Sequence, residues 1–118
     1  MYEAEATLYR ALADPSRLRI LALLREREVC VCELAQLLPI SQPAVSQHLR
    51  RLREAGLVQE HPQGRWTYYS LRDDLSAHVA ALVRRLPADA QAIKVLRGGA
   101  PAACAVEVRQ APGKDVRA

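Results

Sequence analysis

Residues 33–58 read ELAQLLPISQPAVSQHLRRLREAGLV, and this stretch decides the fold. In its second half, Val45, Leu49 and Leu52 recur at spacings of four and three residues, which places them on one face of an α-helix. A shorter apolar helix precedes it and ends at Pro39, so the two helices meet in a tight corner. The pattern predicts a helix-turn-helix.

The second helix carries signals for its start, its end and its outward face. Ser41 is a good N-cap, Pro43 fits the first turn, and Gly56 favours a stop. In a helix-turn-helix, the N-terminal part of this helix enters the major groove, where Gln, Ser and Arg side chains bond base edges. An ordinary solvated helix face is the alternative. The predicted DNA-binding residues are Ser41, Gln42, Ser46, Gln47, Arg50 and Arg51, with Arg65 from the hairpin described below.

Composition limits the class of protein. A chain of 118 residues suffices for one core and one domain. Its 17 basic residues exceed its 13 acidic ones, and several arginines gather around the second helix, which favours phosphate. No apolar run is long enough to cross a membrane, and the N-terminus lacks a signal-peptide pattern, so we expect a cytoplasmic protein with no membrane partner. The odd number of cysteines indicates reduced thiols rather than a disulfide framework.

Two helices and a short strand are predicted ahead of this pair. Residues 2–12 form an amphipathic opening helix. Asp14 then caps a helix that starts at Pro15, and the broad apolar face of that helix predicts central burial. The run Val29-Cys30-Val31-Cys32 is β-branched and compact, and we interpret it as a short strand leading into the helix-turn-helix.

A β-hairpin is predicted directly after the helix-turn-helix. Residues 57–61 and 65–71 alternate as strands do, and residues 62–64 (Pro-Gln-Gly) form the turn between them. Such a hairpin forms a wing, and Arg65 at its tip is expected to reach the DNA backbone. The alternative is a structural edge on which Arg65 is merely solvated.

The remaining chain is expected to serve dimerisation. Asp73 or Asp74 should cap a helix with apolar positions at Leu75, Val79, Leu82, Val83 and Leu86. This helix and the opening one offer more apolar surface than one small fold needs, so we assign both to a two-fold homodimer interface. Residues 89–96 form one further short helix. The predicted fold is mainly α with a small β-hairpin: a winged helix-turn-helix domain over residues 1–97, followed by a flexible tail over residues 98–118.

Three segments carry a resemblance to a known family. They are ADPSRLRILALL (13–24), SQPAVSQHLRRLREAGLV (41–58) and GRWTYYSL (64–71). They are similar to the bacterial ArsR/SmtB family of metal-sensing repressors and occur in that family's usual order. The resemblance implies a homodimeric repressor that leaves its operator DNA when a metal or metalloid binds. It also implies that Gln42, Ser46 and Gln47 face bases, and that Arg65 lies on the backbone.

Within the family, EVCVCEL (28–34) resembles the ELCVCDL stretch of the arsenic-responsive branch. The resemblance implies that Cys30 and Cys32 are thiolate ligands for As(III) or Sb(III), with no organic cofactor. The branch often has a third cysteine three residues after the second, where this chain has Ala35. The third ligand is then either Cys104, from its own or the partner chain, or a small solution thiol.

The thiols fit a soft, thiophilic centre such as arsenite. Residues i and i+2 of a strand lie about 7 Å apart on one face, whereas on a helix they lie roughly 200° apart around the axis. Two sulfurs on one arsenic must be closer, so we expect binding to pull Cys30 and Cys32 together, reshape the entrance of the helix over residues 33–38 and move the DNA-reading helix. The alternative reading is that both cysteines are small buried hydrophobes.

Other functions fit the sequence less well or differ in ligand. The same fold could respond to Cd(II), Pb(II) or oxidants, and a non-specific nucleoid protein is a further rival. An arsenate reductase needs a nucleophile in an anion-binding loop, which is absent around Cys30, so no enzyme is expected. Asp74 and His78 resemble half of the zinc site of other family branches, but residues 86–91 offer only Asp89 for the second half.

Overall fold

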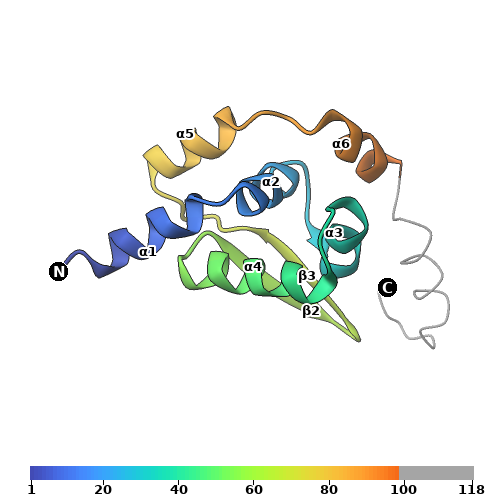
Figure 1. Cartoon of the computed structure of the whole chain (residues 1–118), viewed down its shortest axis with the longest axis horizontal. Coiled ribbons are helices and arrows are strands. Elements are labelled where there is room, and N and C mark those ends of the chain that lie inside the picture. The colour runs from blue at the N-terminus through green and yellow to red at the C-terminus, as the bar shows by residue number, and fades with distance from the viewer. Residues whose placement is uncertain (99–118) are drawn as a thin grey trace.

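The computed structural model of the chain describes residues 1–98, and these residues form six helices and a three-stranded antiparallel sheet (Figure 1). In chain order the elements are α1 (Glu3–Leu12), α2 (Pro15–Leu24), β1 (Val29–Cys30), α3 (Val31–Leu37), α4 (Gln42–Glu54), β2 (Val58–Gln63), β3 (Trp66–Leu71), α5 (Ala77–Arg85) and α6 (Ala90–Arg97). The predicted fold class is confirmed. Cys104 and the predicted tail beyond Gly98 lie outside the described residues.

Helix α2 lies at the centre of the molecule, with α5 and α6 on one side and α4 with the hairpin on the other (Figure 1). Ile20, Leu21 and Leu23 of α2 are completely buried, as its broad apolar face predicted. Asp14 caps the helix, because its Oδ2 accepts a hydrogen bond from the backbone N–H of Arg17 at 3.1 Å. No helix within residues 1–98 is both long enough and apolar enough to cross a membrane.

Helices α3 and α4 form the predicted helix-turn-helix. The apolar stripe of α4 is completely buried, which holds this helix against the rest of the fold. Ser41 caps α4 by accepting the N–H of Ala44 at 3.3 Å. After the helix, Gly56 adopts φ 77°, a left-handed conformation that side chains with a Cβ rarely adopt. The caps therefore fix both ends of α4 as the sequence predicted.

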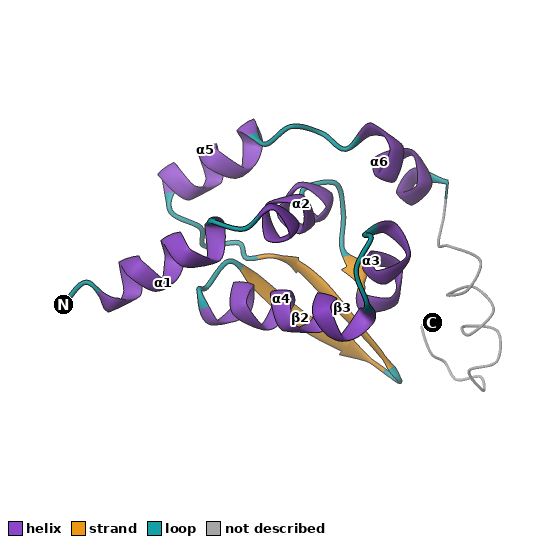
Figure 2. Ribbon diagram, in the orientation of Figure 1, coloured by secondary structure: helices purple, strands orange, loops and turns teal. Residues whose placement is uncertain are grey.

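The wing is a hairpin of β2 and β3 that extends beyond the helices, with α4 packed against it (Figure 2). The predicted turn was placed too early. Pro62 and Gln63 belong to β2, Gln63 pairs with Trp66, and the turn is the two-residue step Gly64-Arg65 with Gly64 at φ 62°. Pro62 is tolerated because β2 is an edge strand in the order β1-β3-β2, where a missing N–H disturbs little.

Two predicted boundaries near helix starts are also corrected. The strand expected over residues 29–32 is only Val29–Cys30, and the remaining residues open helix α3. Neither Asp73 nor Asp74 caps α5, whose N-cap position is Ser76 without a side-chain cap bond. Asp74 is instead held by Arg72, whose guanidinium donates to both of its oxygens at 2.8 and 2.9 Å.

The C-terminal helices are tied to the body by polar contacts as well as apolar ones. Arg25 caps the C-terminal end of α5 by donating to the carbonyl oxygens of Val83 at 2.7 Å and Leu86 at 2.8 Å. The short helix predicted over residues 89–96 is present as α6, with Asp89 as its cap and an Arg19–Asp89 ion pair at 2.6 Å. These contacts hold α5 and α6 against α2.

Candidate nucleic-acid interface and thiol pair

The two cysteines form a close pair at the entrance of the helix-turn-helix. The Sγ atoms of Cys30 and Cys32 lie 2.8 Å apart. The expectation that they lie too far apart to share one ligand is therefore wrong. Cys30 is the extended last residue of β1 (φ −86°, ψ 160°), whereas Cys32 lies in the first turn of α3. Because the pair spans a strand-to-helix boundary, neither the strand spacing nor the helix spacing applies.

Cys30 is held in this position by a capping box. Its Sγ accepts the backbone N–H of Glu33 at 3.4 Å, and the Glu33 carboxylate accepts the backbone N–H of Cys30 at 3.0 Å. Glu33 is buried and forms an ion pair with Arg27 at 2.7 Å. The sequence analysis missed the role of Glu33, because cysteine is not one of the usual N-cap residues. The Cys-x-x-Glu spacing before an apolar helix was the available signal.

The environment of Cys30 favours the protonated thiol. Its side chain is almost completely buried, and burial raises the thiol pKa to about 11, with the nearby Glu33 carboxylate opposing ionisation further. Its backbone hydrogen bonds, chiefly from Glu33, act in the opposite direction but do not compensate. Cys30 is therefore protonated at neutral pH. Cys32 is less deeply buried than Cys30.

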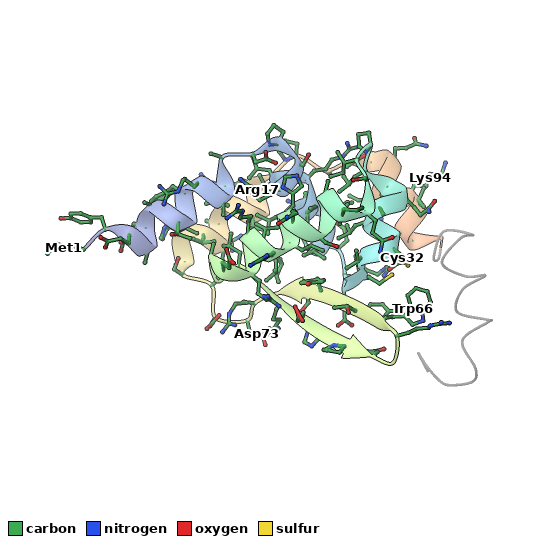
Figure 3. All side chains as sticks on the ribbon, turned by 60° about the horizontal axis from the view of Figure 1, so that its bottom comes forward. Met1, Arg17, Cys32, Trp66, Asp73 and Lys94 are labelled. Carbon is green, nitrogen blue, oxygen red and sulfur yellow. The ribbon has the colours of Figure 1, made fainter. Side chains whose placement is uncertain are left out.

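One pocket of about 340 Å³ brings the two cysteines together with residues predicted to contact DNA. Its lining comes from the start of α3, the start of α4 and the tip of the wing. The lining residues are Cys30, Val31, Cys32, Gln42, Ser46, Arg65, Trp66 and Thr67. Figure 3 shows Cys32 and Trp66 at the same end of the molecule, where the hairpin reaches the helices. A ligand on the cysteine pair would thus occupy space next to the residues predicted to read DNA.

Trp66 is a residue of this pocket that the sequence analysis did not assign to the site. Its indole Nε1 is buried and has no hydrogen-bond partner among the described residues. It is also the only tryptophan in the chain. Its position beside both cysteines makes its fluorescence a direct reporter of binding in the pocket.

On the polar face of α4, some side chains are exposed to solvent, and others pair with a neighbouring residue or line a pocket. Gln42, Ser46 and Gln47 are exposed, as direct reading of bases requires. Arg50 is exposed and pairs with Glu54 at 3.3 Å, four residues along the helix. The predicted DNA-binding residue Arg51 is also exposed, but it lines a second pocket on the side of α4 toward α1 and α2.

Arg53 is exposed and reaches toward the wing. Its guanidinium forms an ion pair with Glu60 of β2, and Glu60 also accepts the Tyr69 hydroxyl at 3.1 Å. Together with the packing of α4 on β2, these contacts join the reading helix and the wing into one unit.

The half-site for zinc noted in the sequence is occupied by other interactions. Asp74 is bound by Arg72, and the pKa of its carboxyl is lowered by that bond. His78 Nδ1 lies 3.1 Å from the Ser76 hydroxyl. Within residues 1–98 no group of three or more His, Cys, Asp or Glu side chains is placed to hold a metal ion. A third ligand for the thiol pair, if Cys104 supplies it, lies outside the described residues.

Comparison with known proteins places the helix-turn-helix in a family. Residues 14–60 match the family described as "Bacterial regulatory protein, arsR family". The chain is 42% identical over 78 residues to the arsenic resistance transcriptional regulator ArsR1 of Pseudomonas putida, covering 65% of this chain and 61% of that protein. It is 47% identical over 81 residues to the transcriptional repressor SmtB homolog of Synechocystis, covering 69% of this chain and 59% of that protein.

A solved structure supports the same assignment. The homodimeric winged helix-turn-helix domain of Mb0332 from Mycobacterium bovis, described as a possible ArsR-family transcriptional regulator, superposes with a TM-score of 0.63 at 32% identity. The match covers 70% of this chain and 76% of that one. The relatives regulate transcription, and none of these three is an enzyme. The chain spans about three fifths of the length of ArsR1 and of the SmtB homolog. The chain belongs to the arsR family of bacterial regulatory proteins, the ArsR/SmtB family of winged helix-turn-helix transcriptional repressors, on the branch that includes the arsenic-resistance regulators.

Proposed function

We propose that the chain is a metalloid-responsive repressor that binds operator DNA as a homodimer and releases it when As(III) or Sb(III) binds Cys30 and Cys32. The observation that carries the proposal is the shared pocket, in which both cysteines lie beside Gln42, Ser46 and Arg65. Similarity to ArsR1 supports a metalloid as the inducer. Acting on operator DNA places the protein in the cytoplasm.

The donor set fits a soft, thiophilic ligand. Two sulfurs 2.8 Å apart present the thiol chemistry that As(III) and Sb(III) prefer to imidazole or carboxylate. When bound, the metalloid would supply a compact trivalent centre that links the sulfurs. Cys104 or a small solution thiol would complete three-sulfur coordination.

The response follows from what surrounds the pair. Because the sulfurs are already close, binding does not need to draw the backbone of residues 30–32 together. A ligand in the pocket would instead change the space between the start of α4 and the wing tip, where Gln42 and Arg65 meet DNA. Only about 1.4 kcal/mol of differential binding lowers operator affinity tenfold.

The unpartnered surface of α1 supports a homodimer. Only Ala11 and Leu12 of this helix are buried, while Tyr2 and Tyr9 are 72% and 54% exposed. On α5, Leu82 and Leu86 are only partly buried against the core. Pairing these helices across a two-fold axis would cover this surface. Dimeric readers place their two recognition helices about 34 Å apart, one turn of DNA.

The test is fluorescence anisotropy of the labelled promoter upstream of the protein's own gene, with arsenite added to the bound complex. We expect arsenite to release wild-type protein and to leave the Cys32→Ser protein bound. Quenching of Trp66 fluorescence in the absence of DNA measures ligand binding separately. Equal release of both proteins would exclude Cys32 as a ligand. The Cys104→Ser variant, tested in parallel, shows whether that residue supplies the third sulfur.

A second candidate, supported by the similarity to the SmtB homolog, is the same repressor responding to Cd(II) or Pb(II). Proton release distinguishes the two. The protonated Cys30 thiol loses its proton to solvent when it binds a divalent cation. When arsenite binds, the thiol proton combines with a hydroxide that leaves the arsenic, and the two depart together as water. Calorimetry in buffers of different ionisation enthalpy therefore shows proton release for Cd(II) or Pb(II) and none for arsenite. Thiol oxidation would be recognised by release under peroxide and reversal by dithiothreitol.

A further inference from the structure

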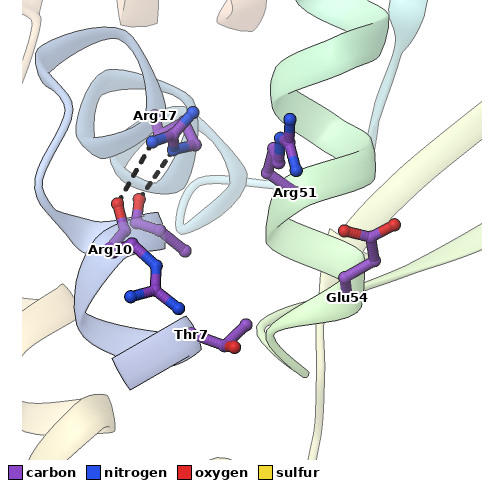
Figure 4. Close-up of a pocket in the computed structure, with 6 residues that line it drawn as sticks. Thr7, Arg10, Arg17, Arg51 and Glu54 are labelled. Atoms are coloured by element: carbon purple, nitrogen blue, oxygen red, sulfur yellow. Dashed lines mark hydrogen bonds between the residues drawn. The ribbon is translucent and has the colours of Figure 1, made fainter. Parts of the chain in front are cut away.

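A second pocket lies on the opposite flank of α4 from the thiols. Its volume is about 430 Å³, and it is enclosed by α1, the start of α2 and the C-terminal half of α4. The residues that line it are Thr7, Arg10, Ala11, Arg17, Arg51 and Glu54. Three arginines and a single acidic residue thus line one cavity (Figure 4).

Arg17 is held rigidly in this pocket. Its Nε donates to the carbonyl oxygen of Ala11 at 2.8 Å and its Nη2 to that of Arg10 at 3.1 Å, which caps the end of α1. Its Nη1 lies 3.1 Å from His48 Nδ1 on α4. These contacts engage three of the five N–H donors that a guanidinium offers, so two remain for a ligand.

Within residues 1–98, the other two arginines have no competing partner. The side chains of Arg10 and Arg51 form no hydrogen bond or ion pair with any residue in the range 1–98. The carboxylate of Glu54 pairs with Arg50 outside the pocket at 3.3 Å, and Figure 4 shows it turned away from Arg17. The Thr7 side chain adds a hydroxyl on the wall formed by α1.

We propose that this pocket binds a phosphate group through Arg10, Arg17 and Arg51. Converging guanidinium groups are the side chains best suited to a tetrahedral oxyanion, since each can donate two parallel hydrogen bonds. The pocket flanks α4, so a duplex held by α4 would place backbone phosphate there. That source rests on the proposed DNA-binding function. Free inorganic phosphate offers the same chemistry and is the other source.

The first arm of the test is the salt dependence of operator affinity. Each phosphate contact contributes about 0.9 to the slope of log K against log salt. A dimer has two such pockets, so Arg10→Gln should reduce the slope by about 1.8. When salt is raised from 50 to 200 mM, operator affinity falls in both proteins. The factor by which it falls would then be about 12 times smaller for the variant than for wild type. Lys94→Gln, which removes the same charge from an exposed position on α6, should leave the slope unchanged.

The second arm uses the protein without DNA. Inorganic phosphate is titrated at constant ionic strength while the side-chain Nε–H resonances of arginine are followed by NMR. Saturable shifts of the Arg10 and Arg17 signals, lost in Arg10→Gln, with an unchanged salt slope, would assign the pocket to free phosphate. No saturable shift together with an unchanged slope would overturn the proposal. Because this arm needs no operator, a failure of DNA binding itself would be recognised separately.

Discussion

Cys30 performs two tasks with one side chain. Its sulfur caps helix α3, and the same sulfur lies 2.8 Å from that of Cys32. Capping fixes where the sulfur points, because the Glu33 N–H and the Glu33 carboxylate hold the residue from both sides. Under the proposed function, the Cys30 thiol is thereby positioned before a metalloid arrives, which reduces the entropy lost on binding.

The first prediction concerns the pH dependence of stability. Burial raises the pKa of the Cys30 thiol from an ordinary value of 9.0 to about 11 in the folded chain. Below pH 9 the Cys30 thiol is protonated in both the folded and the unfolded chain, so its ionisation does not reduce the free energy of unfolding. As pH rises, the unfolded chain loses its proton first, so the free energy of unfolding falls. The expected loss is about 1.4 kcal/mol at pH 10.

The measurement is urea unfolding of reduced protein at pH 8 and pH 10, compared with the Cys30→Ser variant. Serine retains the cap and removes the titration, so the variant should lose less stability over this interval. An equal loss in both proteins would show that Cys30 ionises normally in the folded state.

At this scale the sequence predicted the identity of the site better than its geometry. Cys30 and Cys32 were identified as a pair, but their spacing was derived from regular strand and helix geometry. The strand ends between them, and only the three-dimensional path of the chain reveals that their sulfurs meet. Trp66 could not be assigned either, because period-two alternation does not predict which strand residue lines a pocket made by two helices.

Among the elements, α3 depends on a buried charge. Glu33 caps the helix and is neutralised by Arg27 at 2.7 Å. The second prediction is that Glu33→Gln keeps the cap bond, removes the negative charge near Cys30 and lowers the pKa of its thiol. In a Cys32→Ser background, alkylation of Cys30 by iodoacetamide at pH 8 should therefore become several-fold faster.

The control is Glu26→Gln, which removes the same charge from a side chain paired with Arg97 at 3.0 Å. Its alkylation rate should equal that of the parent protein. If the two variants react equally fast, the local charge of Glu33 does not govern the thiol.

The end of α4 provides the third prediction. Gly56 has φ 77°, and a Cβ added there would meet no atom within 4 Å. The cost of Gly56→Ala is therefore purely conformational, about 1 kcal/mol of unfolding free energy. Gly98→Ala is the matched control, because Gly98 has φ −84° and its added Cβ would make only ordinary contacts at 3.5 and 3.6 Å. Thermal unfolding should separate the two, and equal melting temperatures would contradict the argument.

Elements with strong local signals were predicted well. The predicted caps at Asp14 and Ser41 act through bonds between near neighbours in sequence, and both are present. The wing turn was misplaced because Pro62 normally marks a turn, whereas its place on an edge strand depends on the order of strands in the sheet. A helix cap depends on chemistry between near neighbours in sequence. The position of Pro62 in the sheet depends on tertiary pairing, which a single sequence does not specify.

Across the whole molecule, α4 lies between two pockets of different chemistry. One is lined by the two cysteines with Gln42 and Arg65, and the other by Arg10, Arg17 and Arg51. The contacts of Arg53 with β2 and of Arg17 with His48 connect α4 to the wing and to α2. A change in either pocket would therefore act on the same helix. Under the proposed function, this is how one ligand would alter the affinity of the whole domain for DNA.

The last prediction tests the dimer. Tyr9 is 54% exposed, and Tyr2, seven residues earlier, lies on the same side of α1. If α1 packs against a second copy, Tyr9→Asp places a charge in an apolar interface and should raise the dimer dissociation constant more than tenfold. Tyr9→Phe keeps the ring and should leave the dimer intact. The fold of each chain should survive both changes, because no core contact of the described residues depends on the exposed ring.

Sedimentation equilibrium distinguishes the chain mass of 13.1 kDa from twice that value, and circular dichroism checks that helix content is unchanged. In Tyr9→Asp, operator affinity should fall together with the loss of dimerisation, because a single domain contacts only one half-site. A Tyr9→Asp protein that stays dimeric would exclude this side of α1 from the interface. A monomeric protein that keeps full operator affinity would show that dimerisation does not contribute to binding.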